Sequence, residues 1–240
     1  MSPRPSPPSP HLLPETVAII GAGPLGRWLA LAAARAGFSV LLEDVMPANL
    51  HHAQELLRQQ LGPQPPVEAL DPEGGRGPQR RVLVAGVVEG GFNPRIKSAK
   101  SEGALAPEET PTVAFVSTIE EAVRNADLVI DCVPDELESK LEILLLLDRM
   151  APPRTVLATP TTRHSIADLA SCTYRPTKCV AIVAEANTLA ENPEAGAVRE
   201  ILLRTTAQTA AETVALLDRF WRQLGFTPRF DRDPAESPAS

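Results

Sequence analysis

The sequence predicts an α/β protein with a doubly wound, mostly parallel sheet, forming a single domain between two disordered tails. Three observations support this prediction. Short apolar runs alternate with helical patterns along most of the 240 residues. The first run leads directly into a glycine-rich turn. Hydrophobic residues make up 43% of the chain, which is enough for a substantial core.

The amino-terminal segment carries the most specific pattern. A predicted strand at 16–20 leads into the turn G-A-G-P-L-G at 21–26, from which a helix is expected to run to Ala36. This is the G-x-G-x-x-G fingerprint of a Rossmann-type dinucleotide-binding unit. The first glycine permits the tight turn, the second lets backbone approach a diphosphate, and the third lets the helix pack on the strand. The candidate cofactor-binding residues of this turn are Gly21, Gly23, Pro24, Leu25 and Gly26.

A second predicted strand at 38–42 is followed by Asp44, eighteen residues after the last glycine of the turn. A carboxylate at this place accepts hydrogen bonds from the 2′- and 3′-hydroxyls of a ribose. Neither Arg nor Lys occupies positions 45–47, which favours NAD over NADP. We therefore expect NAD as the cofactor and Asp44 as one of its ligands.

The later elements follow from periodicity and capping signals. Thr118 with Glu121, and Ser165 with Asp168, predict helix starts. The expected elements are a helix at 47–61, a short strand at 81–88, a strand at 113–116, a helix from 119, a strand at 128–133, a helix at 136–150, a strand at 154–159, a helix at 165–170, strands at 178–184 and 201–204, a helix at 209–224 and a strand at 226–230. The helix at 136–150 is expected to bury Leu137, Leu141, Leu144, Leu145 and Leu147. The tract at 62–111 is interpreted as an irregular Pro/Gly-rich excursion of a domain spanning 15–230, and the tails at 1–14 and 231–240 as disordered.

Composition narrows the function classes. The net charge is −7 with no basic stripe, so nucleic acid is not an expected partner. The longest apolar run, 143–147, is too short to cross a bilayer, and the amino terminus lacks the apolar core of a secretory signal. The three cysteines show no metal-ligand spacing, so we expect no metal and free thiols in a reducing cytoplasm.

Three segments together resemble the NAD-binding domain of the 3-hydroxyacyl-CoA dehydrogenases, including the lambda-crystallin type. They are VAIIGAGPLGRWLALAAARAGFSVLLED, ADLVIDCVPDELESKLEILLLLDRMAPPRTVLATPTTRHSIADLA and TAAETVALLDRFWRQLGFTPRF. The resemblance implies an NAD-dependent oxidoreductase that transfers hydride between a 3-hydroxyacyl thioester and NAD in fatty-acid metabolism.

The resemblance also implies further cofactor contacts. Asp131 and Asp135 fall on two acidic positions that lie near the nicotinamide ribose in the family, and Lys140 matches a family lysine. An exposed salt bridge between Lys140 and Glu136 is the alternative. The cofactor contacts implied for this stretch are Val133, Pro134, Asp135 and Lys140.

The catalytic positions depart from the family pattern. The family uses a His oriented by a Glu, on a strand reading like G-L-H-F-F-N-P. Here the His position falls on Val183 or Ala184, neither of which transfers a proton. The candidate catalytic residues are Glu185 as a replacement base, Glu200 as the partner carboxylate, Asn187 at the family's Asn and Thr162 in place of a substrate-binding Ser. His164, just after the Thr loop, is a further alternative.

Three functions remain open at this point. The first is an oxidoreductase of this type with an altered base, and the second is a non-catalytic NAD(H)-binding sensor or partner subunit. The third is another Rossmann hydroxy-acid dehydrogenase. The family continues into a helical domain that this sequence lacks, so we expect a partner chain that supplies it, or a homo-oligomer.

Overall fold

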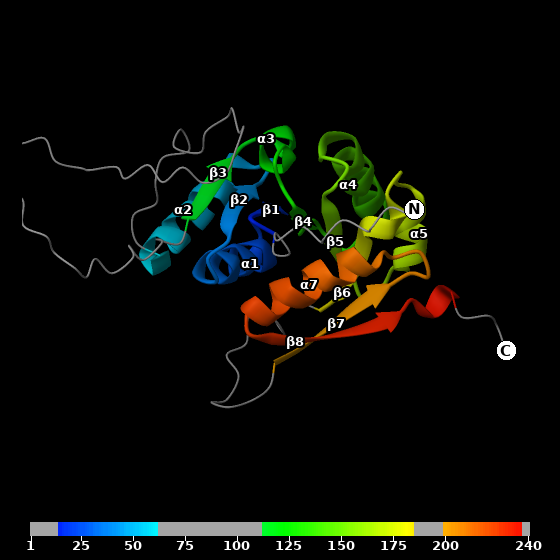
Figure 1. The fold of residues 1–240 in the computed structure, drawn as a ribbon. Helices are drawn as coiled ribbons and strands as arrows, with labels where there is room; N and C mark the ends of the chain where they lie inside the picture. The colour runs from blue at the N-terminus through cyan, green and yellow to red at the C-terminus, as the bar shows by residue number, and fades with distance from the viewer. Residues whose placement is uncertain (1–13, 62–111, 185–198, 237–240) are drawn as a thin grey trace, which may run out of the picture. The chain divides into compact units, whose positions relative to one another are not determined.

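The computed structural model describes residues 14–61, 112–184 and 199–236, which form one sheet flanked by helices (Figure 1). The predicted fold class is confirmed. In chain order the described elements are β1 (Thr16–Ile20), α1 (Pro24–Arg35), β2 (Ser39–Glu43), α2 (Pro47–Leu61), β3 (Thr112–Val116), α3 (Ile119–Val123), β4 (Leu128–Asp131), α4 (Leu137–Met150), β5 (Val156–Pro160), α5 (Ile166–Ser171), η2 (Pro176–Lys178), β6 (Cys179–Val183), β7 (Arg199–Thr205), α7 (Ala211–Gln223), β8 (Phe226–Arg232) and η3 (Pro234–Glu236). The predicted strand at 81–88 and the excursion at 62–111 lie outside the described residues.

The sheet has the strand order β3-β2-β1-β4-β5-β6-β7-β8. Neighbouring strands are parallel throughout, except that β7 runs antiparallel to β6. The chain leaves β1 in one direction for β2 and β3, and later returns to its other side with β4. Such a switch point opens a crevice beyond the carboxyl ends of the two central strands, where open α/β sheets bind ligands.

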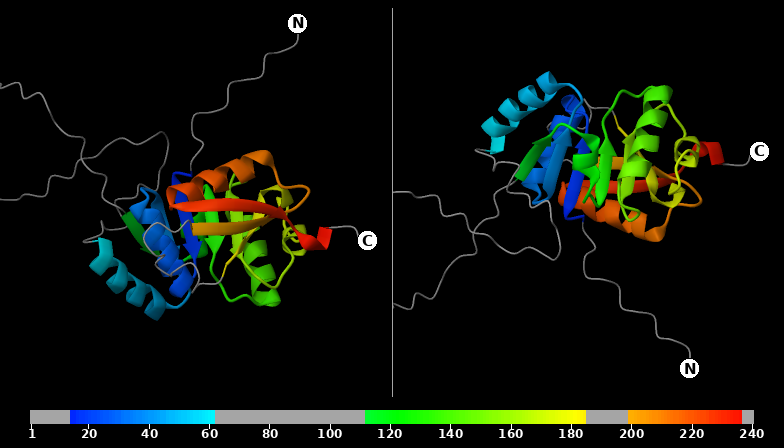
Figure 2. Two further views of the ribbon diagram at one scale, coloured as in Figure 1. Left: turned by 90° about the horizontal axis from the view of Figure 1, so that it is seen from below. Right: turned by 90° about the horizontal axis from the view of Figure 1, so that it is seen from above.

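The sheet separates two hydrophobic cores. One lies under α1, α2 and α7, and the other under α3, α4 and α5. Figure 2 shows α4 and α7 on opposite sides of the sheet. Edge-to-face ring contacts join α1 to the carboxyl-terminal elements, with Trp28 and Trp221 both packed on Phe226 at 5.8 and 5.3 Å between centroids. This aromatic cluster fixes α7 and β8 against α1.

Local sequence signals place several helix ends as predicted. The Thr118 hydroxyl accepts a hydrogen bond from the Glu121 amide at 3.3 Å, and the Ser165 hydroxyl accepts one from the Asp168 amide at 3.2 Å. Gly37 follows α1 with a φ of 89°, the left-handed conformation that commonly ends a helix. The sequence predicts these helix ends because each cap involves residues that are only a few positions apart in the chain.

The buried face of α4 differs from the prediction. Leu137 and Leu145 are 47% and 42% exposed, so the expectation that both point inward is wrong. The inward stripe comprises Lys140, Ile143, Leu144 and Leu147, the i, i+3, i+4, i+7 spacing of one helix face. A lysine occupies one of its inward positions, which moves the stripe away from the two outer leucines.

Regular structure continues beyond residue 230, where the sequence predicts that the carboxyl-terminal tail begins. Residues 231–236 are ordered: β8 continues to Arg232, and Asp233 is only 2% exposed. The Asp233 carboxylate accepts hydrogen bonds from the Ser165 hydroxyl at 2.8 Å and the Ala167 amide at 3.0 Å. The tail is held because it supplies the anionic cap for the amino-terminal end of α5.

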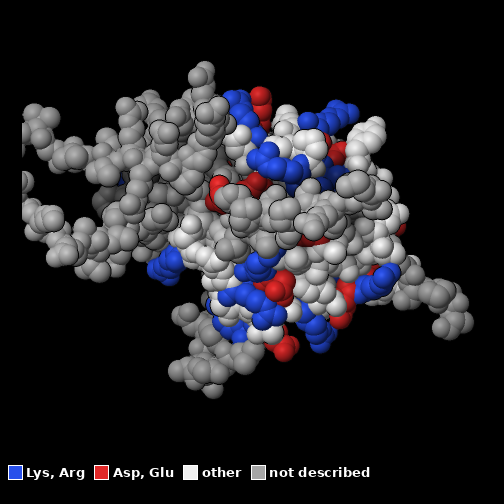
Figure 3. Space-filling view, in the orientation of Figure 1, with Lys and Arg blue, Asp and Glu red and all other residues white. Residues whose placement is uncertain are grey.

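Among the described residues on the face drawn in Figure 3, Lys and Arg side chains lie interspersed with Asp and Glu side chains. Within the described ranges, no helix is both long enough and apolar enough to cross a membrane.

Candidate functional site

The glycine turn closes the carboxyl end of β1. Gly21 has a φ of +103°, which favours glycine, and its amide donates to the Glu43 carbonyl at 2.7 Å. A Cβ added to Gly26 would lie 1.8 Å from the carbonyl oxygen of Gly21. The third glycine is therefore required by packing between the turn and α1, as its place in the fingerprint predicts.

Gly23 serves a different purpose. Its φ of −66° is open to any residue, and a Cβ there would meet nothing within 4 Å. Folding alone thus gives no reason for a glycine at this position. The open space lies at the start of α1, where Gly23 makes no side-chain cap and the first helical amides lack intrahelical acceptors. Space beside amide donors at a helix start suits a phosphate group.

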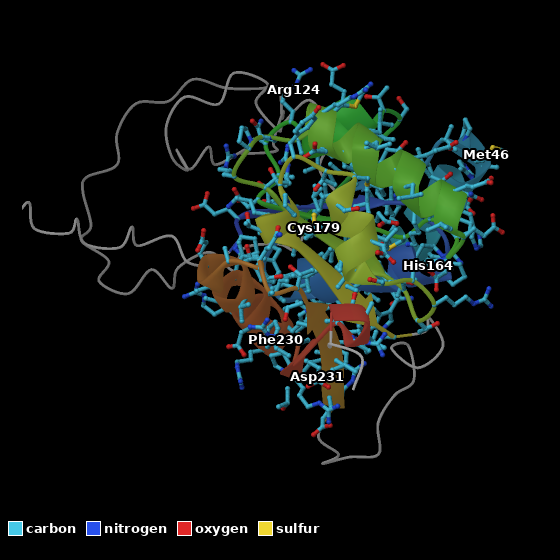
Figure 4. The ribbon with its side chains drawn as sticks, turned by 90° about the vertical axis from the view of Figure 1, so that its right-hand side faces the viewer. Met46, Arg124, His164, Cys179, Phe230 and Asp231 are labelled. Atoms are coloured by element: carbon cyan, nitrogen blue, oxygen red, sulfur yellow. The ribbon has the colours of Figure 1, made fainter. Side chains whose placement is uncertain are left out.

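A cavity of about 860 Å³ extends from this turn along the carboxyl edge of the sheet. It reaches from the residues after β2 to those after β5 and β6. Met46, which borders the cavity after β2, lies toward the right-hand side of Figure 4. The residues bordering it are Ile20, Gly21, Gly23, Pro24, Leu25, Glu43, Asp44, Val45, Met46, Asn49, Ile119, Cys132, Val133, Pro134, Asp135, Glu136, Ile143, Pro160, Thr161, Thr162, Arg163 and Ala184.

Asp44 is held rigidly at one end of this cavity. One carboxylate oxygen accepts the Ala22 amide at 2.8 Å and the other accepts the Met46 amide at 2.8 Å. The Asn49 side-chain amide lies 3.2 Å from both oxygens. The carboxylate is thus tied to the glycine turn and to α2, which fixes its position relative to the open space at Gly23.

Glu43 is a buried acid of the cavity wall for which the sequence predicts no role. It is 4% exposed and borders the cavity directly beside Asp44. Burial, and then the negative charge of Asp44, raises the pKa of Glu43 from 4.5 to about 7. The sequence does contain a signal for this residue. Glu43 is an acid at the end of an otherwise apolar strand, directly before the acid that belongs to the fingerprint.

Asp131 and Lys140 form an ion pair at 2.7 Å in which both side chains are 0% exposed. The alternative of an exposed bridge from Lys140 to Glu136 is therefore wrong. Neither Asp131 nor Lys140 borders the cavity. The lysine enters the α4 face because it neutralises the buried carboxylate at the end of β4.

The segment after β5 is tied to the turn after β4. The Thr162 amide donates to the Asp135 carboxylate at 3.0 Å, and His164 Nε2 lies 3.4 Å from the Asp135 carbonyl and 3.7 Å from its Oδ1. The Asp135 Oδ1 atom is buried without a hydrogen-bond partner among the described residues. Asp135 and Thr162 thus come together on the cavity wall.

Comparisons with known proteins identify the family to which the chain belongs. The model of the family described as "3-hydroxyacyl-CoA dehydrogenase, NAD binding domain" matches residues 16–72 and 85–228. The chain belongs to this family. NAD is accordingly its cofactor. The glycine turn, the open space at Gly23 and the fixed Asp44 carboxylate are the features of this structure that fit an NAD molecule.

Individual relatives of this family are distant in sequence. The chain is 28% identical over 206 residues to the probable 3-hydroxybutyryl-CoA dehydrogenase of Bacillus subtilis, covering 85% of this chain and 59% of that protein. It is 27% identical to the bovine lambda-crystallin homolog over 60% of this chain and 36% of the relative. The chain thus spans between about a third and three fifths of the length of these relatives.

Among solved structures, 3-hydroxybutyryl-CoA dehydrogenase from Escherichia coli is similar with a TM-score of 0.63 at 24% identity, covering 92% of this chain and 38% of that one. The structure of 5-formyl-3-hydroxy-2-methylpyridine 4-carboxylic acid 5-dehydrogenase also gives 0.63, at 23% identity over 91% and 58% of the two chains. These likenesses support the fold.

The sequence prediction puts the family's histidine at Val183 or Ala184, and both residues are apolar. Val183 ends β6, and Ala184 borders the cavity just beyond it. No histidine borders the cavity within the described part of the chain. Glu200 is exposed near the start of β7 and does not border the cavity, while Glu185 and Asn187 lie outside the described residues.

Proposed function

We propose that this family member is an NAD-dependent oxidoreductase that transfers hydride between a 3-hydroxyacyl thioester and NAD, in cytoplasmic fatty-acid metabolism. The observation that carries the proposal is Gly23: the position has room for a side chain, yet its space adjoins the start of α1. The cavity continues from that space to Thr162 and Ala184, so one crevice offers room for both cofactor and substrate.

The cofactor is proposed to follow the cavity lining. Its diphosphate lies against the backbone N–H groups of Gly23 and Leu25 at the start of α1, and its adenosine ribose binds Asp44. The ribose hydroxyls replace the long, shared contacts from Asn49, which at 3.2 Å are the weakest that Asp44 makes. The nicotinamide end lies toward Val133, Pro134 and Asp135. When bound, NAD accepts the hydride.

Oxidation of a hydroxyl also requires a base for its proton. We assign this role to Glu185, which follows the cavity-lining Ala184 directly in the chain, with Asn187 as a supporting polar group. Glu200 is left out of this role, because it is exposed on β7 and does not border the cavity. The Thr162 hydroxyl is proposed to bind substrate, because its backbone is already fixed by the Asp135 carboxylate.

NADH formation from a panel of short 3-hydroxyacyl-CoA thioesters tests this proposal. We expect turnover by the native chain and a loss of about 10²–10⁴-fold in Glu185→Gln, the usual contribution of a general base. The matched control is Glu120→Gln, an exposed carboxylate on α3, which is expected to keep full activity. Full activity in Glu185→Gln would show that another group takes the proton.

A second candidate is a non-catalytic NAD(H)-binding sensor or partner subunit. The specific observation that favours it is the apolar Ala184 on the cavity wall, one of the two positions, with Val183, that the sequence prediction matches to the family's histidine. Saturable NADH binding without turnover of any thioester supports this alternative, and turnover of a non-thioester hydroxy acid indicates a different dehydrogenase. Co-purification with a helical chain, or a homo-oligomer by light scattering, identifies the expected partner.

A further inference from the structure

Glu43 lies in apolar surroundings on the α3 and α4 side of the sheet. In register it has Ile20 of β1 on one side and Val116 of β3 on the other, and both belong to the core under α3 and α4. Ile119 and Ile143 border the same cavity. The carboxyl group is thus placed at the end of a buried strand with hydrocarbon on both flanks.

The Glu43 carboxyl group has no partner within the described residues. No hydrogen bond to it contributes to its titration, and no interaction of this residue remains beyond those described. Neither of its carboxyl oxygens is among the fully buried polar atoms that lack a partner. Because these oxygens have no partner, they must keep some exposed surface, and that small exposure is at the cavity. An unpartnered polar group that is 96% buried on a cavity wall is costly unless a ligand completes it.

The charges around Glu43 disfavour its ionised form when an anionic ligand is present. Asp44 is adjacent and negative. Asp131, two strands away in register, is neutralised by Lys140. On α3, Glu120 is paired with Arg124, and Glu121 lies in the first turn. None of these groups offers Glu43 a free cation. Bound NAD adds the negative charge of its diphosphate and excludes water from the cavity wall, and both effects favour the neutral form of the Glu43 carboxyl group.

We propose that Glu43 is a second contact of the adenosine half of the cofactor, and that it binds as the neutral acid, donating a hydrogen bond to an acceptor nitrogen or oxygen of the adenosine. The inference rests on the proposed placement of NAD with its adenosine at Asp44. The two neighbouring acids then have different roles. Asp44 accepts hydrogen bonds from the ribose hydroxyls, and Glu43 donates one to the adenosine. Above neutral pH, forming the complex takes up one proton from solvent at Glu43.

The pH dependence of NADH affinity tests the inference on the native chain by calorimetry. With a group whose pKa is about 7, and with only its protonated form competent, the dissociation constant rises roughly tenfold between pH 6 and pH 8. Titrations at pH 8 in buffers of different ionisation enthalpy are expected to show uptake of close to one proton. ADP-ribose, which lacks the nicotinamide, is expected to show the same dependence.

Two variants separate the charge of Glu43 from its donor group. Glu43→Gln keeps an N–H donor and cannot ionise, so we expect affinity independent of pH, near the native value at pH 6. Glu43→Leu is also expected to be independent of pH but roughly fivefold weaker, by the value of one hydrogen bond. Glu120→Gln is the control and retains the native pH profile.

Native affinity that is flat or rises with pH overturns the inference, as does a pH slope that persists in Glu43→Gln. If neither variant at position 43 folds, the native proton uptake alone decides. Absence of NADH binding at every pH instead defeats the proposed NAD site, whereas binding without proton uptake defeats only the role of Glu43.

Discussion

Replacing Lys140 with methionine provides a sharp test of the buried ion pair. The ammonium group lies 2.7 Å from Asp131 Oδ1, with both side chains wholly buried. Methionine fills a similar volume but leaves the carboxylate without its cation, in a place where water cannot replace it. Breaking a buried pair from one side costs about 3–5 kcal/mol. For a chain of this size that corresponds to a fall in melting temperature of roughly 6–20 °C.

Urea unfolding followed by circular dichroism measures the loss. The double variant Asp131→Asn with Lys140→Met removes both charges and keeps an acceptor, so it is expected to regain about 1–3 kcal/mol relative to the sum of the single changes. The control is Arg222→Met, because Arg222 is 56% exposed in its pair with Asp218 and its loss is expected to leave the urea midpoint close to the native value.

If Lys140→Met unfolds at the same urea concentration as the native chain, the ion pair does not stabilise the fold. If it also lost NADH binding while keeping native stability, the lysine would be a cofactor ligand, as the family resemblance implied, and its burial against Asp131 would be secondary.

Three further predictions concern the glycine turn and the two acids beside it. Gly26→Ala is expected to abolish folding or cofactor binding, since its Cβ would lie 1.8 Å from the Gly21 carbonyl; a native melting curve with native NADH affinity contradicts this. Asp44→Ala is expected to weaken NADH binding by about tenfold or more, the loss of charged hydrogen bonds to the ribose; unchanged affinity in calorimetry means that the ribose lies elsewhere. Because Glu43 has a pKa of about 7 in the fold and 4.5 as a free group, the native chain loses stability as pH rises from 4.5 through 7. Glu43→Gln is therefore expected to be more stable than native by about 1–2 kcal/mol at pH 8 and equal to it near pH 4.5, allowing for partial solvation of the group; equal melting temperatures at pH 8 would show that Glu43 ionises freely.

The parts of this structure that the sequence predicted are those encoded by local geometry. The turn at 21–26 and the cap at Thr118 depend on residues a few positions apart, so their patterns are visible in the chain itself. The acid at Asp44 is likewise recognisable by its spacing from the glycines. The Rossmann order of the sheet then follows from the alternation of strands and helices.

The remaining features depend on contacts between distant segments. Lys140 was expected to lie near the cofactor or at the surface, and only the packing of α4 over β4 shows that it is buried against Asp131. Asp233 caps α5 through Ser165, a residue 68 positions earlier in the chain. Glu43 gave a signal in the sequence, but its missing partner is evident only from the neighbouring strands.

Calorimetric titration of NADH into the native chain and into Gly23→Ala tests whether the glycine turn binds the cofactor's diphosphate. A methyl group at position 23 meets nothing in the fold, so the variant is expected to melt at or slightly above the native temperature. We predict saturable NADH binding by the native chain and its loss in Gly23→Ala. Equal binding by both, or no heat of binding from the native chain, would contradict the account.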